Sequence, residues 1–248
     1  MRCERLVWGL LLCVTVLSGC VATRVGTGLA GVTKAQEAQD AARVHTELGQ
    51  HYMELGDLQT ALHKLKLALH FDKNYAPTYT VLAVVYERIH DFSDALANYR
   101  KAQRLEPGKG APNNNLGAFL CRRGKVHQAL PYFRRALADP FYTTPDVAWT
   151  NAGVCRLQIH DYKGAEASFR RAIAINAANT NALFQLARVM YRKHDAFHAR
   201  IFLERYEALA RETPAALKLG HAIEMRLGHT AAAHRYLKRL QKRFPNAR

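Results

Sequence analysis

One arrangement of large and small residues returns about every 34 positions through most of this 248-residue chain. Counted from the first residue of each segment, the first four segments carry Gly or Ala at repeat positions 8, 20 and 27. In the second segment these residues are Ala83, Ala95 and Ala102. A fixed period of this length indicates a stack of similar units that bury one continuous core between neighbours. The six segments begin at Ala42, Ala76, Gly110, Asp146, Thr180 and Pro214.

This spacing resembles the tetratricopeptide repeat, a helix–turn–helix unit of 34 residues. Small residues let the two antiparallel helices of a unit approach to about 8–10 Å. The aromatic residues at repeat position 24, Tyr99, Phe133 and Phe169, fill the space between units. The resemblance predicts an all-α fold, a right-handed superhelical solenoid of about six tetratricopeptide repeats. We expect the repeats at residues 42–75, 76–109, 110–143, 146–179, 180–213 and 214–247, the last two being the most degenerate.

The turn inside each unit carries Gly or His at repeat position 15, and Asp follows in four of the six units. Gly at a helix end can adopt a left-handed conformation, His there meets the negative end of the helix dipole, and Asp caps the next helix. Metal ligation is the alternative for the His-Asp pairs. Each pair lies in a turn of a different unit, so we interpret the pairs as caps and expect no metal site. The pairs are His90-Asp91, His160-Asp161 and His194-Asp195.

The N-terminus carries the features of an export signal. Arg2 and Arg5 precede an uncharged apolar run over residues 6–17, and this run ends in Leu-Ser-Gly-Cys20. The tetrapeptide looks like a bacterial lipobox, in which the Cys becomes the lipidated first residue. A membrane-spanning helix is the alternative, but twelve residues reach roughly 18 Å and the hydrocarbon core measures ~30 Å. We therefore expect residues 1–19 to be a lipoprotein signal peptide and Cys20 to carry lipid.

Residues 21–33 are rich in Gly and lack any periodicity, which is typical of a tether. We expect the lipidated Cys and a flexible tether over residues 20–33 and the solenoid over residues 34–248. Val21 follows Cys20, and the absence of Asp there resembles lipoproteins that are sent on to the outer membrane. The expected location is therefore the outer membrane of a Gram-negative bacterium, with a lipid anchor and the solenoid facing the periplasm.

Two cysteines remain in the expected solenoid, Cys121 and Cys155. They fall at positions 12 and 10 of the first helices of neighbouring units, which lie side by side. A disulfide is feasible if the Cα atoms come within about 7 Å, and the periplasm is oxidising. Two small buried apolar residues are the alternative. We favour the disulfide.

The net charge of +16 is concentrated toward the C-terminus, where residues 186–248 hold fourteen Lys or Arg against five Asp or Glu. A basic field speeds encounters with acidic surfaces or anionic headgroups. The export signal argues against nucleic acid as the partner. A solvated basic face without a specific ligand remains the alternative.

The sequence contains no Gly-rich phosphate loop, no Gly-x-Ser-x-Gly and no His-Glu-x-x-His motif. Its acidic residues do not form the paired carboxylates of a hydrolytic site. We therefore expect a binding protein rather than an enzyme, with no cofactor and no small-molecule substrate.

Three stretches go beyond the generic repeat pattern: residues 113–121, which read Asn-Asn-Asn-Leu-Gly-Ala-Phe-Leu-Cys, residues 138–145, and residues 151–155, which read Asn-Ala-Gly-Val-Cys. With the lipobox and six repeats, they resemble the type IV pilus biogenesis lipoproteins called PilF or PilW over nearly the whole chain. That resemblance implies an outer-membrane pilotin, a protein that helps the secretin subunit reach the outer membrane and form its ring. It implies a secretin subunit like PilQ as the partner.

Residue chemistry alone predicts a partner-binding groove on the concave face. The first unit carries Thr46 and Gln50 where chaperone-binding repeats carry Lys and Asn, so an acidic C-terminal tail is not the expected ligand. Amide side chains at position 6 can pair with the backbone of an extended peptide, or they can bond the neighbouring helix instead. The expected groove residues are Met53, Val84, Asn115, Ala118, Asn151, Val154 and Leu157.

A second function fits the same fold and anchor. A repeat lipoprotein can serve as an adaptor for other envelope machinery, such as peptidoglycan enzymes or β-barrel assembly. Loss of twitching motility with intact cell shape after gene deletion would favour the pilotin, whereas shape or permeability defects would favour the adaptor.

The lipid anchor is predicted to be needed for placement and not for folding. Because Cys20 and the tether precede the solenoid, Cys20→Ala should leave a helical, soluble repeat domain that no longer fractionates with the outer membrane. Circular dichroism and membrane fractionation check both halves of this expectation. A Cys20→Ala protein that stays membrane-bound after a high-salt wash would show that the lipobox interpretation is wrong.

Overall fold

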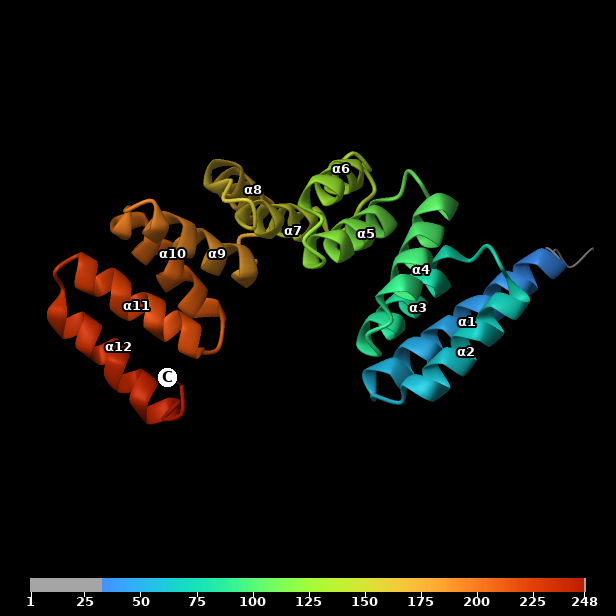
Figure 1. Ribbon diagram of the computed structural model, residues 1–248, viewed down its shortest axis with the longest axis horizontal. Helices are drawn as coiled ribbons and strands as arrows, with labels where there is room; N and C mark the ends of the chain where they lie inside the picture. The colour runs from blue at the N-terminus through green and yellow to red at the C-terminus, as the bar shows by residue number, and fades with distance from the viewer. Residues whose placement is uncertain (1–32, 248) are drawn as a thin grey trace, which may run out of the picture.

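The computed structural model describes residues 33–247, and these residues fold into twelve α-helices with no strand among them (Figure 1). The predicted Cys20 anchor and the signal peptide lie outside the described residues. The first helix has 21 residues and begins at Lys34, whereas the others have 12 to 14. The helices are α1 (Lys34–Glu54), α2 (Leu58–Phe71), α3 (Ala76–Arg88), α4 (Phe92–Leu105), α5 (Gly110–Arg122), α6 (Val126–Leu137), α7 (Pro145–Leu157), α8 (Tyr162–Ile175), α9 (Thr180–Arg192), α10 (Ala196–Leu209), α11 (Pro214–Arg226) and α12 (Thr230–Arg243).

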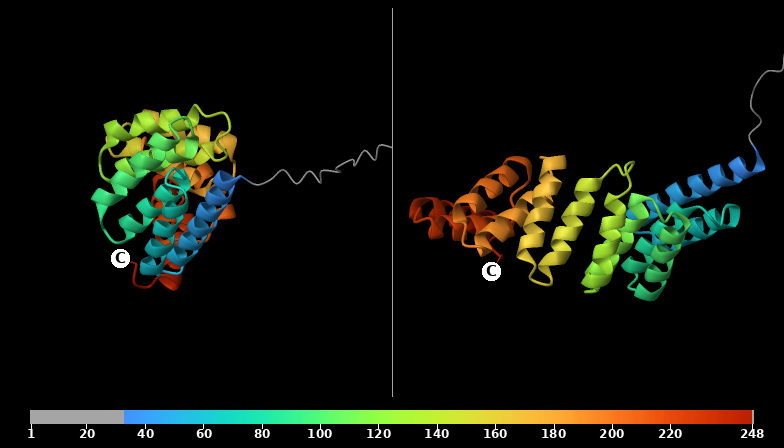
Figure 2. Two further views of the ribbon diagram at one scale, coloured as in Figure 1. Left: turned by 90° about the vertical axis from the view of Figure 1, so that its right-hand side faces the viewer. Right: turned by 90° about the horizontal axis from the view of Figure 1, so that it is seen from above.

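Each odd-numbered helix pairs with the next even-numbered one, and the six pairs follow one another along an arc (Figure 1). Around the middle of the arc, α5, α7 and α9 lie toward its inside, and α6 and α8 lie toward its outside. Seen from above, the pairs form a single row (Figure 2). The predicted all-α solenoid of helix–turn–helix repeats is confirmed. Within residues 33–247, every helix is too short or too polar to cross a bilayer.

The small residue at repeat position 8 sets the distance between the two helices of a unit. A Cβ built on Gly117 would lie 3.0 Å from Cε1 of Phe133, and one on Gly49 would lie 2.6 Å from Cγ of Leu65. Such separations are closer than ordinary van der Waals contact. The ring or branched side chain of the second helix therefore occupies the volume that a side chain on the first helix would need.

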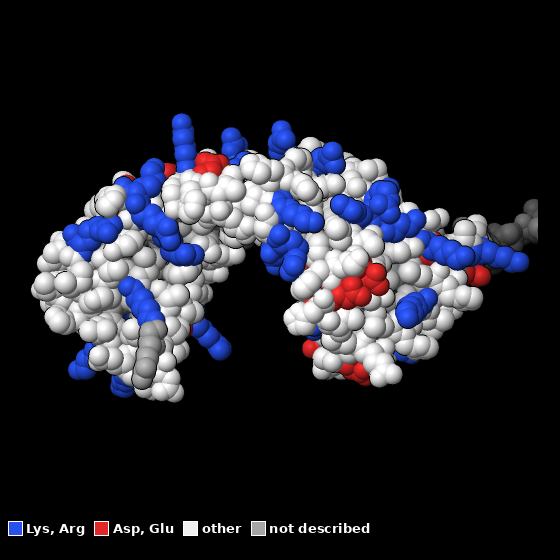
Figure 3. Space-filling view, viewed as in Figure 1, with Lys and Arg blue, Asp and Glu red and all other residues white. Residues whose placement is uncertain are grey.

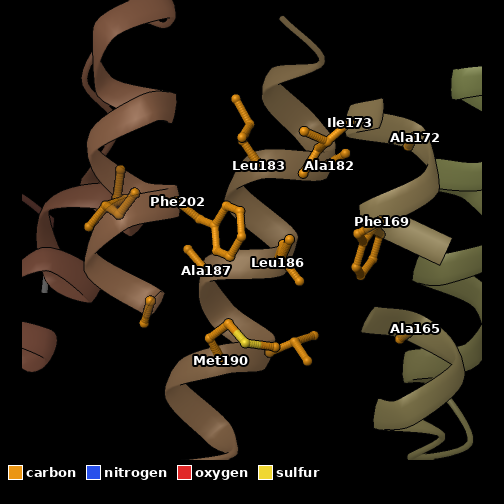
Figure 4. Close-up of a cluster of buried hydrophobic side chains, with 14 of the residues drawn as sticks. Ala165, Phe169, Ala172, Ile173, Ala182, Leu183, Leu186, Ala187, Met190 and Phe202 are labelled. Atoms are coloured by element: carbon orange, nitrogen blue, oxygen red, sulfur yellow. The ribbon is translucent and has the colours of Figure 1, made fainter. Parts of the chain in front are cut away.

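The core continues from unit to unit through the same contact. Phe169 of α8 is fully buried against Gly153 of its own unit. Figure 4 shows Leu186 of α9 between the rings of Phe169 and Phe202, which come from α8 and α10. Each large residue thus packs within its unit and against the next one. This is why no unit can bury its apolar surface alone.

The turns confirm the Asp caps and give the His residues a further role. The N-cap carboxylates of Asp57, Asp91, Asp161 and Asp195 each accept a backbone N–H from the following helix. His90, His160 and His194 adopt positive φ values of 63°, 58° and 64°. Gly56, Gly124 and Gly228 adopt the same left-handed conformation in the other three units. The His residues therefore occupy a backbone position that favours Gly.

The longer connection between the third and fourth units is fixed by Asp139. Its carboxylate accepts N–H bonds from Gly110 at 2.8 Å and from Phe141 at 3.0 Å. These two bonds hold the pKa of Asp139 below its usual value. Tyr142 then packs onto Gly110, in the space that a side chain at that position would need. The added residues thus close over the start of α5.

A larger side chain at repeat position 8 should destabilise the protein. Gly117→Leu forces Phe133 out of a fully packed site and should lower the free energy of unfolding by about 1–3 kcal/mol or more. Gly108→Ala is the matched control, because a Cβ there meets nothing within 4 Å. Chemical denaturation compares the two, and a Gly117→Leu protein as stable as the control would contradict the repeat register.

Replacing a His residue in a left-handed turn by Gly should, in contrast, stabilise the protein. His194→Gly should raise the free energy of unfolding by roughly 0.5–1 kcal/mol. Relief of left-handed strain, about 1–2 kcal/mol, exceeds the entropy that Gly adds to the unfolded chain, about 0.4–1 kcal/mol. Gly228→Ala should do the reverse, since its φ is +78° and its Cβ would have free space. Chemical denaturation measures both. Unchanged stability of both variants would show that the turn conformation carries no strain.

Candidate functional site in the inner groove

A pocket of about 260 Å³ lies between α7 and α9, the first helices of the fourth and fifth units. We call it the α7–α9 pocket. Its position between two first helices places it on the inside of the arc (Figure 1). Its lining residues are Val154, Leu157, Gln158, His160, Tyr162, Gln185, Arg188, Val189 and Arg192.

Helical spacing explains why these side chains meet. Val154 and Leu157 are three residues apart on α7, and Gln185, Arg188 and Arg192 follow one another at spacings of three and four on α9. Residues at these spacings share one face of a helix. Val154 and Leu157 also pack partly against the core cluster of the fourth to sixth units, so the floor of the pocket is anchored in that core.

Two guanidinium groups stand at the pocket. Arg188 donates to Oε1 of Gln185 at 2.9 Å, and Arg192 donates to the Tyr162 hydroxyl at 3.1 Å. Arg188 also lies 6.0 Å from the ring centre of Phe184. Among residues 33–247, neither arginine contacts a carboxylate. The α7–α9 pocket therefore combines an apolar floor with uncompensated positive charge.

A second pocket of about 250 Å³ lies nearer the N-terminus, where α1, α3 and α5 converge. We call it the α3–α5 pocket. It carries Glu106 and no basic residue, so its charge is opposite to that of the α7–α9 pocket. Its lining residues are Gln50, Pro77, Thr80, Val81, Glu106, Ala111, Pro112 and Asn115.

Most of the predicted groove residues do not gather in one place. Val154 and Leu157 line the α7–α9 pocket, and Asn115 lines the α3–α5 pocket. Val84 of α3 and Ala118 of α5 line neither pocket and are half-buried against the core cluster of the second and third units. The predicted groove residues are thus divided between two separate pockets and the core.

Met53 was expected to be an accessible groove residue, and this prediction is wrong. Its side chain is only 7% exposed and packs in a core cluster with Leu65 and Leu82. The first unit is covered by α3, and the long, flexible Met side chain fills the space between the helices. Arg88 reaches across from α3 to donate to the Met53 carbonyl.

The expected amide ladder is also only partly available to a peptide. Asn151 donates to Oδ1 of Asn114 at 3.1 Å, so it joins two neighbouring first helices. Gln185 accepts from Arg188. The side chain of Asn151 therefore bonds a neighbouring helix, which was the alternative to binding a peptide backbone. The side chain of Asn115 makes no hydrogen bond to the described part of the chain and remains a candidate for backbone recognition.

Arg188 and Arg192 of the α7–α9 pocket were not among the predicted groove residues. A signal exists for Arg192, because a basic residue recurs at repeat position 13, whereas Arg188 lies at position 9, where no other unit carries a basic residue. Arg122 at this position pairs with Glu87, and Arg226 donates to the carbonyl of Tyr191, each one unit back. Position 13 thus faces the preceding unit along the inner edge. The residues at this position are Arg88, Arg122, Arg192 and Arg226.

The structure joins Cys121 of α5 to Cys155 of α7 in a disulfide, with Cα atoms 5.6 Å apart. This distance meets the requirement set by disulfide geometry. Both residues are buried, and Gln158 of the α7–α9 pocket donates to Sγ of Cys121 at 3.5 Å. The bond therefore ties the third unit to the fourth directly behind this pocket.

Positive charge also covers the outer edge of the arc (Figure 3). Second helices contribute exposed pairs such as Arg134 and Arg135 on α6. Some of the basic residues near the C-terminus have acidic partners, because Arg239 and Arg243 both pair with Glu212. These ion pairs hold the pKa of Glu212 below its usual value. Part of the basic C-terminal run thus stabilises the last unit.

The stack of helical pairs, together with the 34-residue period and its recurring small residues, assigns the chain to the class of tetratricopeptide-repeat proteins. The family model described as tetratricopeptide repeat matches residues 80–143 and 120–180. Repeat solenoids of this class are typically non-catalytic scaffolds for other proteins.

Two pilus proteins resemble the chain over most of its length. It is 24% identical over 232 residues to the type IV pilus assembly protein PilF of Pseudomonas aeruginosa, spanning 93% of this chain and 90% of that protein. The crystal structure of PilW, described as a widely conserved type IV pilus biogenesis factor, superposes with a TM-score of 0.77 at 30% identity, covering 83% of this chain and 94% of that one. A solved structure of Pseudomonas aeruginosa PilF gives 0.79 at 22% identity, covering 85% and 95%. The chain belongs to the family of tetratricopeptide-repeat proteins that contains PilF and PilW.

The disulfide should contribute strongly to stability. Closing a loop of 34 residues removes unfolded-state entropy worth roughly 3–4 kcal/mol in the chain-entropy model. Reduction should therefore lower the free energy of unfolding of the wild type and leave that of a Cys121→Ser/Cys155→Ser variant unchanged. Thiol labelling of freshly isolated native protein measures the oxidation state. Two reactive thiols without reduction would contradict the bond.

Proposed function

We propose that this protein is an outer-membrane lipoprotein that acts as a pilotin for the secretin of the type IV pilus. In this role it accompanies the secretin subunit to the outer membrane and promotes its assembly into a ring. The observation that carries the proposal is the match to PilF and PilW over more than four-fifths of the chain. Membership in the family that contains PilF and PilW supports a role in pilus assembly. The secretin as the partner is part of our proposal.

The inner groove supports a role in binding protein. Its two pockets are separated along the arc, so an extended segment of a partner could occupy both at once. Repeat grooves recognise such segments through apolar side chains in pockets and hydrogen bonds to the peptide backbone. The protein itself would supply binding and placement, and the proposed action requires no catalysis.

Placement follows from the sequence features of the N-terminus. A lipid on Cys20 and a tether over residues 21–33 would hold the first unit close to the inner surface of the outer membrane. Each buried methylene of the acyl chains contributes roughly 0.8 kcal/mol to membrane binding. The groove would then meet a secretin subunit as that subunit reaches the bilayer.

Gene deletion tests the proposal directly. We expect loss of twitching motility, loss of heat-stable secretin multimers on gels, and unchanged cell shape. Normal secretin multimers in the deletion strain would refute the pilotin role. Defects in cell shape or permeability with normal pili would instead support the adaptor for other envelope machinery.

Blocking the α3–α5 pocket should impair secretin assembly without unfolding the protein. Ala111 is exposed and lines this pocket, so Ala111→Trp fills it from the rim. Ala97→Trp is the matched control, since Ala97 is exposed on α4, the second helix of its unit. Met53 is unsuitable for such a test because it belongs to the core.

The measurement is the fraction of secretin in heat-stable multimers after complementation of the deletion strain. Ala111→Trp should reduce this fraction several-fold, whereas Ala97→Trp should restore it fully. Equal complementation by the two variants would show that the α3–α5 pocket does not take part.

A further inference from the structure

We propose that the α7–α9 pocket binds an extended protein segment in which an apolar side chain is flanked by Asp or Glu. The apolar side chain enters between the two helices, and the carboxylates bind Arg188 and Arg192. This inference rests on the proposed function, because it takes the occupant to be a segment of a partner protein. It goes beyond that function by assigning the site and the chemistry of the segment.

The size of the pocket favours a single side chain. Its volume of about 260 Å³ lies below the range of pockets that enclose drug-sized ligands, roughly 300–1,000 Å³. Val154 and Leu157 supply an aliphatic surface between the helices, and Val189 lies beneath it. Because Val189 is fully buried and belongs to the core cluster, this surface is held rigidly.

The charge around the pocket favours a carboxylate. Two other basic residues near the pocket already have acidic partners. Arg122 pairs with Glu87 at 2.7 Å, and Lys193 pairs with Glu166 at 2.7 Å. Burial alone would raise the pKa of Glu166, but its bonds with Lys193 and Arg170 hold this pKa below its usual value. The chain thus neutralises Arg122 and Lys193 and leaves Arg188 and Arg192 with only neutral contacts.

Those neutral contacts position the two guanidinium groups. Gln185 accepts from Arg188, and the Tyr162 hydroxyl accepts from Arg192. Both arginines come from one face of α9, four residues apart, so carboxylates on either side of one anchor can reach them. Bonds between a guanidinium and a carboxylate are roughly twice as strong as bonds between neutral groups.

Two amide side chains complete the site. Gln158 directly follows α7, and Gln185 lies on α9. The side-chain carbonyl of Gln185 already accepts from Arg188, and the amide nitrogen of Gln158 donates to Cys121 Sγ. An amide both donates and accepts, so the side-chain N–H groups of Gln185 and the side-chain carbonyl of Gln158 can bond the peptide backbone on the two sides of the anchored side chain. This arrangement suits an extended segment better than a helix, whose backbone bonds are already made within itself.

A random seven-residue peptide library displayed on phage tests the proposal. The bait is the purified full-length chain in mild detergent, either as wild type or with Arg188→Glu/Arg192→Glu. The control bait carries Arg134→Glu/Arg135→Glu, which makes the same change in charge at two exposed positions of α6. Arg188 and Arg192 are exposed as well, and melting curves verify that all three proteins are folded.

We expect wild type and control to enrich peptides with an apolar residue flanked by Asp or Glu. The Arg188→Glu/Arg192→Glu protein should lose this enrichment, and the selected peptides should bind it at least about tenfold more weakly. Enrichment of basic or purely apolar peptides would overturn the proposal. It would also be overturned by a library that yields no enriched peptide, or by enrichment that survives the double substitution.

A second arm separates this inference from the proposed function. The deletion strain is complemented with each of the three chains, and secretin multimers are measured. Multimers restored by the control but not by Arg188→Glu/Arg192→Glu support the pocket. Multimers restored equally by both overturn the pocket and leave the pilotin role intact. If deletion itself leaves the multimers unchanged, the pilotin role fails whatever the library selects.

Discussion

The contact between a small residue on the first helix and a large side chain on the second is the constraint on which this structure depends. Gly117 against Phe133 and Gly153 against Phe169 are its clearest cases. The contact brings the helices of one unit together and leaves the far side of each ring free to pack on the next unit. Repetition of this contact produces the row of helical pairs, and the row creates the groove between first helices.

The groove has two ends of different chemistry. The α3–α5 pocket carries Glu106 and amide or hydroxyl groups, whereas the α7–α9 pocket carries two arginines over an aliphatic floor. The disulfide between Cys121 and Cys155 lies between these ends and ties the third unit to the fourth. A partner that spans both pockets would therefore meet a surface whose polarity and spacing are fixed by the fold. Electrostatic complementarity of this kind gives specificity and register more than affinity.

The period of the sequence was sufficient to predict the fold, because each recurring small or large residue has one packing role. The inner surface was harder to predict. Met53 shares its repeat position with Leu157, yet Met53 is core and Leu157 lines a pocket. Asn151 and Asn115 likewise share a position, and only Asn151 bonds the neighbouring helix. Whether an inner residue stays accessible to a partner depends on how closely adjacent units pack. The sequence of a single unit does not determine this packing distance. The recurring basic residue at repeat position 13, by contrast, was visible in the sequence.

If the proposed function is right, the inner groove holds a protein of the pilus assembly machinery. Site-specific photo-crosslinking in cells that make pili tests it most directly. A photoreactive amino acid is placed at Ala111 or Leu157 on the inner surface, or at Arg134 on the outer one, and the adducts are identified by mass spectrometry. We expect adducts with the secretin from both inner positions and none from the outer position. Adducts from Arg134 alone, or inner adducts only with proteins unrelated to the pilus, would contradict it.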